Sequence, residues 1–335
     1  MGGRIAVLGA GLIGCYVGGR LAAGGAAVTL IGRARVLEPL RRDGLVLSGL
    51  DGWRARVAPD ALAFATGPEA LAGAGLILVT VKSAATGSAA DDIRAHSDPD
   101  ALIVSLQNGV DNAARLRAAL PGRAVLAGMV PFNVAEPEPG RFHQGTSGAL
   151  AVEAGATIAP WRGAFAAAGL SLDEHADMAA VMWGKLLLNL NNAVNALSGM
   201  TLAEELATRG YRRALALAMA EALAVLRRAG IAPARIGPAP PGLMPWLLRL
   251  PDPLYRRVAR RSAPAIDREA RSSMAEDLAA GRATEVDHIN GAVTDLAARI
   301  GSSAPVNRAL VRLVRAAERG APPLAPGALL AELRR

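Results

Sequence analysis

The chain has 335 residues, of which 52% are hydrophobic, 3% are aromatic and 37 are glycine. This length and composition predict a two-domain globular protein of the α/β kind, and they exclude a fibrous or a disordered chain. The formal net charge of +8 comes from arginines that are scattered and not interleaved with aromatic residues, so we expect no nucleic-acid partner.

The cellular setting follows from what the sequence lacks. No apolar run is long enough to span a bilayer, and no charged-then-apolar leader precedes the first strand-like run. The single cysteine, Cys15, excludes an internal disulfide and fits a reducing compartment. The four histidines show no metal-ligand spacing. We therefore expect a cytoplasmic protein without a membrane partner or a metal site.

The first predicted strand, residues 4–8, leads directly into a glycine-rich turn. An amphipathic helix and a second strand, residues 27–31, follow it. Here the GxGxxG pattern stands between a strand and a helix, which is the context it requires. Such glycines allow a tight turn, a close approach of backbone amides to a pyrophosphate, and tight packing of helix on strand. The pattern predicts a Rossmann-type dinucleotide site formed by Gly9, Ala10, Gly11, Leu12, Ile13 and Gly14.

The residues after the second strand indicate which dinucleotide binds. An NAD enzyme usually has an acidic residue there for the ribose hydroxyls, but this chain has none. Arg33 stands at that place and offers a planar cation to a 2′-phosphate. We therefore expect NADPH as the cofactor, and we interpret Arg35 as a solvated surface residue.

Further strands are predicted at residues 76–81, 101–106, 124–128 and 149–152, with Ala-rich helices between them. This alternation predicts a mostly parallel sheet, whose ligands lie beyond the carboxyl ends of its strands. Lys82 and Asn108 follow two of those ends. Lys82 is expected to face cofactor or substrate. Asn108 could hold the nicotinamide amide, a ribose or a substrate carbonyl, or it could simply form an Asn-Gly turn.

Lysine is rare in this chain. Only Lys82 and Lys185 are lysines among 37 basic residues, the rest being arginine. A lysine ammonium is compact and can give up its proton, whereas guanidinium stays charged and needs more room. We therefore expect proton transfer or tight packing at these positions.

The pattern changes after a predicted strand at residues 171–175, because long apolar-periodic helices follow. We predict an NADP-binding domain at residues 1–176 and an all-α substrate domain at residues 177–335. The helix from Met178 carries Lys185, with Asn189 and Asn192 on the same face. Polar side chains in an apolar helix are costly to bury without partners, which favours a polar ligand cleft over core packing. Solvated exposure is the alternative.

Two later segments are less regular. Residues 231–264 contain eight prolines, which predicts an irregular insertion or a lid. Residues 271–291 are rich in polar and acidic side chains. Glu285 and Asp287 there could be ordinary acids of a helix start, favoured by the helix dipole.

Taken together, these pieces resemble the ketopantoate reductase family, the 2-dehydropantoate 2-reductases, over nearly the whole chain. The resemblance is carried by the segments GAGLIG, VKS, LQNG, WGKLLLN and SSMAEDLAAGRATEVDHING, of which the last two are the most specific. It implies reduction of 2-dehydropantoate to (R)-pantoate by NADPH, on the way to pantothenate and coenzyme A.

The resemblance also implies roles for single residues. Lys185 would be the general acid at the ketone oxygen, and Glu285 would orient its ammonium or contact cofactor and substrate. Beyond the glycine turn and Glu285, the family's cofactor positions match Arg33, Lys82, Asn108 and the backbone near Val134. Its substrate positions match Asn108, Asn189, Asn195 and Ser273.

The chain departs from the family pattern on the substrate side. Ala196 follows Asn195 where the family usually has proline, so Asn192 could take the substrate role. Residues 201–205 replace an Asn-Gly-Glu-Leu-like segment. A related reductase of another 2-keto acid or ketone therefore remains an alternative. A silent NADPH-binding regulator would need neither Lys185 nor Glu285. The apolar helical domain could support a homodimer.

Overall fold

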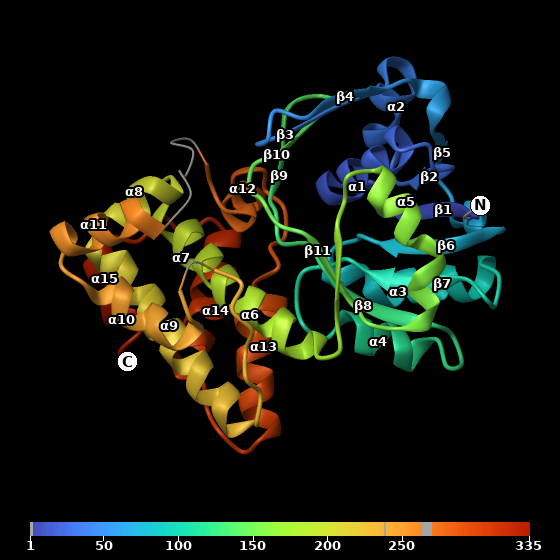
Figure 1. Cartoon of the computed structure of the whole chain (residues 1–335). Coiled ribbons are helices and arrows are strands. Elements are labelled where there is room, and N and C mark those ends of the chain that lie inside the picture. The colour runs from blue at the N-terminus through green and yellow to red at the C-terminus, as the bar shows by residue number, and fades with distance from the viewer. Residues whose placement is uncertain (1–2, 238, 263–269) are drawn as a thin grey trace. The chain divides into compact units, whose positions relative to one another are not determined.

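The computed structural model describes residues 3–237, 239–262 and 270–335. The chain divides into two compact units, Met1–Met178 and Ala179–Arg335. Strands and helices alternate in the first unit, and the second is built from helices (Figure 1). The predicted fold class, a Rossmann-type parallel-sheet domain followed by an all-α domain, is confirmed. None of the helices in the described ranges is long and apolar enough to cross a membrane.

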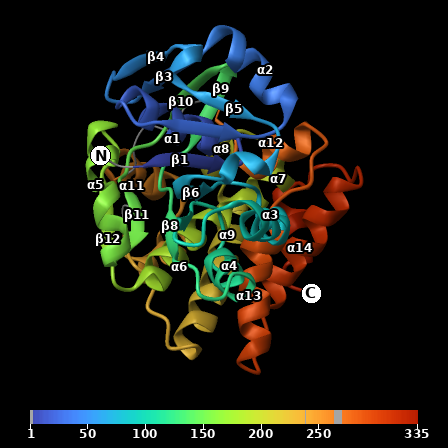
Figure 2. The same cartoon turned by 90° about the vertical axis from the view of Figure 1, so that its right-hand side faces the viewer.

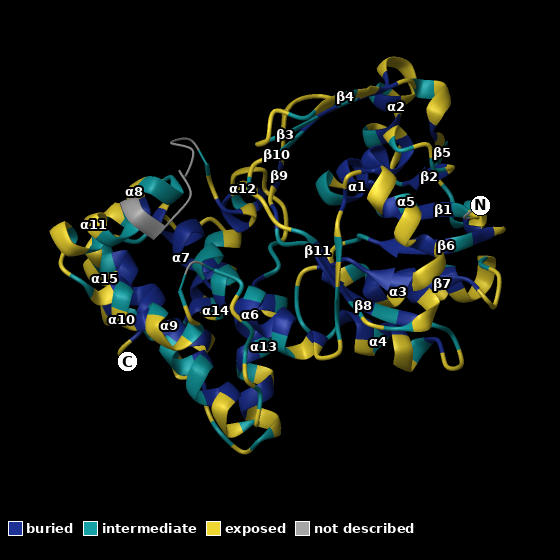
Figure 3. Ribbon diagram, in the orientation of Figure 1, coloured by how far each residue is buried: buried dark blue, intermediate teal, exposed yellow. Residues whose placement is uncertain are grey.

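An eight-stranded sheet forms the centre of the first unit. Its strands pair in the order β12-β11-β8-β7-β6-β1-β2-β5, and all neighbours are parallel except β8 and β11. The strands are β1 (Arg4–Leu8), β2 (Val28–Ile31), β5 (Ala63–Ala65), β6 (Ala74–Val79), β7 (Leu102–Ser105), β8 (Val125–Met129), β11 (Leu150–Glu153) and β12 (Leu172–His175). The central strands are buried on both faces, as expected when helices cover both sides (Figure 3).

The helices of this unit divide between the two faces of the sheet. Alternate residues of β1 show the division: Ile5 and Val7 belong to the core that contains α1 and α5, whereas Ala6 and Leu8 belong to the core with α3 and α4. The helices are α1 (Leu12–Ala23), α2 (Ala34–Asp43), α3 (Thr86–His96), α4 (Asn112–Ala119) and α5 (Arg162–Ala167), with short 3₁₀ turns at Pro59–Ala61, Pro68–Leu71, Ser83–Ala85 and Ala156–Trp161.

A second sheet was not predicted from the sequence. Four strands pair in the order β4-β3-β10-β9, and they lie together in both views of the ribbon (Figures 1 and 2). Leu45, Leu47 and Phe142 from this sheet join the core that contains α1. The strands are β3 (Leu45–Gly49), β4 (Arg54–Val57), β9 (Val134–Glu138) and β10 (Arg141–Gln144).

The second unit packs around its longest helix, α9. Helices α8, α10, α14 and α15 all contact it. The helices are α6 (Met178–Asn189), α7 (Asn191–Ser198), α8 (Leu202–Ala207), α9 (Arg209–Arg228), α10 (Met244–Arg249), α11 (Asp252–Ser262), α12 (Ser273–Ala279), α13 (Val286–Arg299), α14 (Pro305–Glu318) and α15 (Pro326–Glu332), with a 3₁₀ turn at Pro241–Leu243.

Two expectations for this unit need correction. The helix from Met178 is two helices, α6 and α7, which are separated at Leu190. The proline-rich stretch is not irregular throughout, because α10 and α11 lie within it. The buried Arg212 ties these helices to the rest of the unit by donating to the backbone oxygen of Leu250, 3.1 Å away, and to Oδ1 of Asp252, 2.5 Å away. Residues 238 and 263–264 of that stretch lie outside the described residues.

Candidate functional site

The glycine turn between β1 and α1 has the geometry that its sequence predicts. Gly9 has a φ of 116°, and a Cβ there would stand 2.6 Å from the backbone nitrogen of Val81. A Cβ on Gly14 would overlap the carbonyl oxygen of Gly9 and stand 2.7 Å from Oγ1 of Thr80. Gly11 is different, because a Cβ there would meet nothing within 4 Å. Packing thus requires Gly9 and Gly14, while the surface at Gly11 is open to a ligand.

The open end of α1 suits an anion. Gly11 is the N-cap residue, no side chain caps the helix, and the first turn contains no acidic residue. The first-turn N–H groups and the positive end of the helix dipole therefore face this opening. Ala10 is buried in the turn, and Leu12 and Ile13 are half-buried at the helix start. This cradle fits the pyrophosphate of a dinucleotide.

Arg33 lies beside the same turn. A Cβ on Gly32 would stand 2.5 Å from the Cβ of Ala10, so the end of β2 packs directly on the glycine turn. Arg33 is the next residue, exposed at the N-cap position of α2, and the first turn of α2 contains no acidic residue. A cationic side chain without a competing carboxylate fits a phosphate on the adenosine ribose.

A buried polar network joins the turns that carry Lys82 and Asn108. The hydroxyl of Ser83 donates to the carbonyl oxygen of Asn108 over 2.9 Å. Asn112 donates from Nδ2 to Ser83 Oγ over 3.0 Å and to the Asn108 oxygen over 2.5 Å. Thr86 completes the network by donating to Asn112 Oδ1 over 2.8 Å. The network thus ties together the two turns that carry Lys82 and Asn108, and both of these residues are exposed.

Val134 lies in the four-stranded sheet. It begins β9 and is buried in the core that also contains Tyr16 of α1. The structure therefore places Val134 against the helix of the glycine turn, while its contact with a cofactor stays a proposal.

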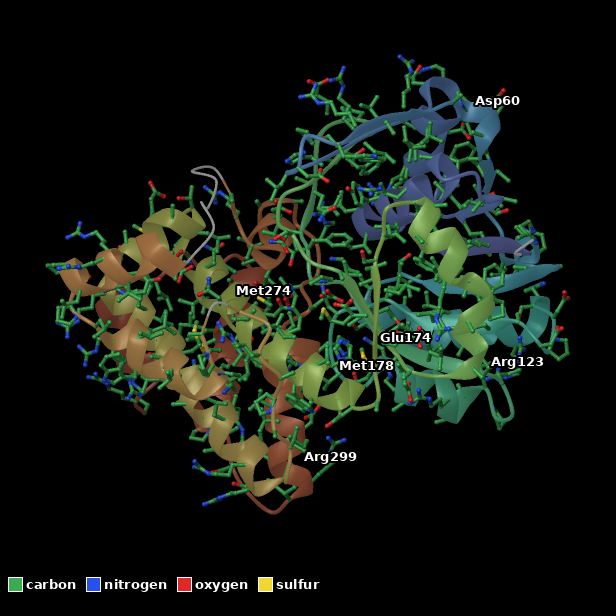
Figure 4. All side chains as sticks on the ribbon, viewed as in Figure 1. Asp60, Arg123, Glu174, Met178, Met274 and Arg299 are labelled. Atoms are coloured by element: carbon green, nitrogen blue, oxygen red, sulfur yellow. The ribbon has the colours of Figure 1, made fainter. Side chains whose placement is uncertain are left out.

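In the second unit, Lys185 and Asn189 lie one turn apart on α6, which begins at Met178 (Figure 4). Both side chains are half-buried, although the helix is otherwise apolar. Burial disfavours the charged ammonium and lowers the pKa of Lys185 to about 8. At neutral pH the side chain is thus still mostly protonated, but it gives up its proton more readily than an ordinary lysine.

The asparagines of α7 differ from one another. Asn192 is half-buried, and its backbone oxygen accepts a hydrogen bond from Ser272 over 3.2 Å. Asn195 is fully buried, with its Nδ2 donating to the Met200 oxygen and its Oδ1 accepting from the backbone nitrogen of Ser272. Both ends of the Asn195 amide are therefore engaged: Oδ1 ties α7 to the start of α12, and Nδ2 bonds to the turn that follows α7.

A buried carboxyl group lies beside this junction. Glu205 of α8 is fully buried, and Nδ2 of Asn191 donates to its Oε2 over 3.0 Å. Burial raises the pKa of Glu205 to about 8, although hydrogen bonds from Asn191 and Asn195 oppose the shift. Glu205 belongs to the segment that departs from the family pattern, and its role is in the interior of the unit.

Ser273 and Glu285 stand at two helix starts. Ser273 is the exposed first residue of α12, whereas the neighbouring Ser272 is the N-cap, whose Oγ accepts from the backbone nitrogen of Ala275. Glu285 is the half-buried N-cap residue of α13. Met274, labelled in Figure 4, anchors α12 in the core with 1% of its surface exposed.

Sequence reasoning missed the residues that hold these groups in place. Thr86, Gln107 and Asn112 in the first unit, and Ser272 and Glu205 in the second, are buried and hydrogen-bonded. For Thr86 and Asn112 the available signal was a polar residue at the start of an Ala-rich helix. In the part of the chain that the structure describes, no cluster of three His, Cys, Asp or Glu side chains could hold a metal ion.

Comparison with known proteins finds two family models that together span most of the chain. The model described as "Ketopantoate reductase PanE/ApbA" matches residues 5–156. The model described as "Ketopantoate reductase PanE/ApbA C terminal" matches residues 177–318.

Relatives with similar sequences carry the same activity in their names. The 2-dehydropantoate 2-reductase of Halobacterium salinarum is 32% identical, and the alignment covers 94% of this chain and 99% of the relative. The enzyme of that name from Pyrococcus horikoshii is 28% identical, and the alignment covers 94% of this chain and 97% of the relative.

Solved structures give the same fold. A PanE/ApbA family ketopantoate reductase from Ralstonia eutropha JMP134 superposes with a TM-score of 0.80 at 31% identity, covering 94% of this chain and 98% of the other. A D-mandelate dehydrogenase in a ternary complex with NADH and anilino(oxo)acetate has a TM-score of 0.78 over the same shares. Because the sequences are only 20% identical, this similarity supports the assignment of the fold and nothing more.

Proposed function

Because the chain belongs to the ketopantoate reductase family, oxidoreductases of small keto acids that use a nicotinamide cofactor, we propose that it reduces 2-dehydropantoate to (R)-pantoate with NADPH. The observation that carries the proposal is a half-buried lysine in an apolar helix, with its pKa lowered to about 8. The reaction would supply pantoate for pantothenate and coenzyme A.

The preference for NADPH rests on Arg33. Arg33 is exposed and directly follows Gly32, which packs on the glycine turn, and a carboxylate at this position would favour NADH instead. Replacing Arg33 with Ala should weaken NADPH binding about 10-fold or more and leave NADH binding nearly unchanged. The affinity for each cofactor is measured by titration, with nicotinamide fluorescence as the signal. Arg35→Ala is the control, and equal losses for both cofactors in Arg33→Ala would contradict the assignment.

Lys185 is proposed as the general acid. Bound NADPH supplies the hydride to the ketone carbon, which leaves negative charge on the ketone oxygen. The Lys185 ammonium stabilises that charge and gives its proton to the oxygen. Arginine could not replace it, because guanidinium is too weak an acid.

The remaining site residues take binding roles. We propose that the glycine turn, Lys82, Asn108, Glu285 and the backbone near Val134 bind the cofactor, with Asn108 also within the substrate's reach. Asn189, Asn192 and Ser273 are proposed to bind the substrate's hydroxyl and carboxylate. Asn195 is proposed to act on the substrate side by holding α7 to the start of α12, since its Oδ1 accepts a hydrogen bond from the backbone nitrogen of Ser272. The domain at residues 1–176 would thus supply most of the cofactor contacts and the domain at residues 177–335 most of the substrate contacts, with Glu285 and Asn108 as the exceptions.

A second candidate is reduction of another 2-keto acid. It is favoured by residues 201–205, where a capping box at Thr201 and Glu204 opens α8 and Glu205 is buried. The segment contains no asparagine, so it cannot supply the substrate-binding asparagine of the family pattern.

The deciding experiment measures NADPH oxidation with ketopantoate and with a panel of other 2-keto acids. Wild type, Lys185→Ala and Lys82→Arg are compared. General acid catalysis contributes roughly 10²- to 10⁴-fold, so Lys185→Ala should lose turnover by that factor and keep its NADPH affinity. Reduction of only a different keto acid would support the second candidate. NADPH binding without any reduction would favour a regulatory protein.

A further inference from the structure

The proline-rich segment packs against the helix that carries Lys185. Ala234, from residues 231–237 of this segment, donates its backbone N–H to the carbonyl oxygen of Ala180 on α6 over 2.8 Å. One turn further along α6, a Cβ on Gly184 would overlap the carbonyl oxygen of Ala234 and stand 2.9 Å from Cγ1 of Ile236. The glycine at position 184 is what allows the two backbones to come this close.

The contact continues along one face of the helix. A Cβ on Gly237 would stand 3.3 Å from Leu188, which lies one turn beyond Gly184. The space left between α6, α9 and the segment is about 10 Å³, which is at the limit of what a single water requires. Segment and helix are therefore closely packed, and one cannot shift without moving the other.

We propose that residues 231–237 form a positioning element for Lys185, which sets the place of the α6 turn by closing on Gly184. The inference deepens the proposed function, because it assumes that Lys185 delivers the proton. Gly184 immediately precedes Lys185, so a displaced turn carries the lysine with it. The segment touches the face of α6 that contains Ala180, Gly184 and Leu188, whereas Lys185 and Asn189 project about 100° further round the helix. The segment can thus buttress the lysine without occupying the substrate side.

The test is Gly184→Ala, which forces the helix and the segment apart. A misplacement of about 1 Å can cost on the order of 10²-fold in rate, so kcat should fall between about 10- and 100-fold. NADPH affinity should stay at the wild-type value, because the glycine turn belongs to the other unit. Ile236→Ala loosens the same contact without introducing strain, so it is expected to fold and to show a smaller loss of kcat.

Two matched controls separate positioning from general destabilisation. Gly210→Ala adds a methyl group 2.5 Å from Pro326 Cβ at the start of α9, a comparable overlap far along the chain from α6. Gly327→Ala adds a methyl group in α15 where nothing lies within 4 Å. Both variants should keep the wild-type kcat once corrected for the folded fraction. If Gly210→Ala loses as much kcat as Gly184→Ala, the positioning role is refuted.

The second readout does not need turnover. Protein made with ¹³C-labelled lysine gives only two lysine signals, and Lys82→Arg assigns them. The pKa of Lys185 should rise from about 8 in Gly184→Ala and Ile236→Ala, as loosened packing admits water, and stay unchanged in both controls. An unchanged pKa together with an unchanged kcat overturns the inference. If the wild type reduces no keto acid, the proposed function fails, while the lysine signals still decide whether the segment positions Lys185.

Discussion

Burial makes Lys185 a stronger acid than an ordinary lysine. Its pKa is about 8 in the folded protein and 10.5 as the ordinary value, because burial penalises the charged form. As the proposed general acid, the lysine would work only while protonated, so kcat should be constant below about pH 7 and fall about tenfold per pH unit above about pH 8. Turnover measured across that range tests this. Lys82→Arg should keep the profile, and a profile flat to about pH 10 would contradict the assignment.

Glu205 has the opposite shift and a different consequence. Its pKa rises to about 8 from 4.5, so the folded state keeps a proton that the unfolded chain loses. Tyr211 of α9 and Tyr255 of α11 face this carboxyl group, and its charge contributes to raising the pKa of each. No side chain that contributes to its shift is basic.

The free energy of unfolding should therefore fall as the pH rises from about 4.5 to about 8, by up to a few kcal/mol from this residue. Glu205→Gln, which cannot ionise, should lose less stability over that window. Urea unfolding at about pH 5 and pH 8 measures the difference. Glu204→Gln, an exposed neighbour in the same helix, is the control. If the free energy of unfolding depends on pH equally in wild type and in Glu205→Gln, the Glu205 carboxyl group is not neutral in the folded protein.

Among the elements, the first βαβ unit was the most predictable. Its strands are apolar, and its glycine turn stands between a strand and a helix. The expectation of an amphipathic helix was wrong, because α1 is buried at every residue from Gly14 to Ala22. The four-stranded sheet was not predictable in this way. Its strand β9 contains Pro137 and exposes most of its residues, and β3 pairs with β10 about a hundred positions later. Short polar strands held by distant partners have no local signal.

The helical unit shows the same limit. Pro245 and Pro253 are the second residues of α10 and α11, where proline favours a helix start instead of breaking a helix. The division of α6 from α7 at Leu190 has no proline or glycine to mark it. Lys185 could be singled out by residue type, because it is one of two lysines in the chain, and its role stays a prediction. Asn112 and Glu205 could not be singled out, because only the folded structure brings their partners together.

The network at Asn112 provides a test at the scale of these elements. Removing its side chain takes one hydrogen bond each from the buried Ser83 and Thr86 and two in all from the Asn112 amide nitrogen, at a cost of roughly 1–3 kcal/mol. Asn112→Ala should lower the melting temperature and weaken NADPH binding about 10-fold. The reason is that the turns with Lys82 and Asn108 lose the hydrogen bonds from Asn112 that join them. Calorimetry and cofactor titration measure both. Ser88→Ala, on the exposed face of α3, should change neither; unchanged NADPH affinity in Asn112→Ala would contradict the positioning role.

For the whole molecule, the net charge of +8 should act on its reactants at a distance. A keto acid and NADPH are both anions, so a positive protein attracts them, and added salt screens the attraction. We expect kcat/KM to fall several-fold between roughly 10 and 300 mM NaCl. Sucrose of matched viscosity is the control, and a constant kcat/KM would show that the net charge does not draw the reactants to the protein.

The homodimer expected from the apolar helical unit stays a prediction, which light scattering can test.

The scarcity of lysine also gives the protein a simple susceptibility to proteolysis. A protease that cleaves only after lysine finds two bonds, one in the exposed turn after β6 and one in the middle of α6. The first can be cut in the native state, and the cofactor contact proposed for Lys82 would shield it. The second can be cut only when α6 opens. The sizes of the fragments would therefore report separately on the occupancy of the nucleotide site and on the local stability of the helix that carries Lys185.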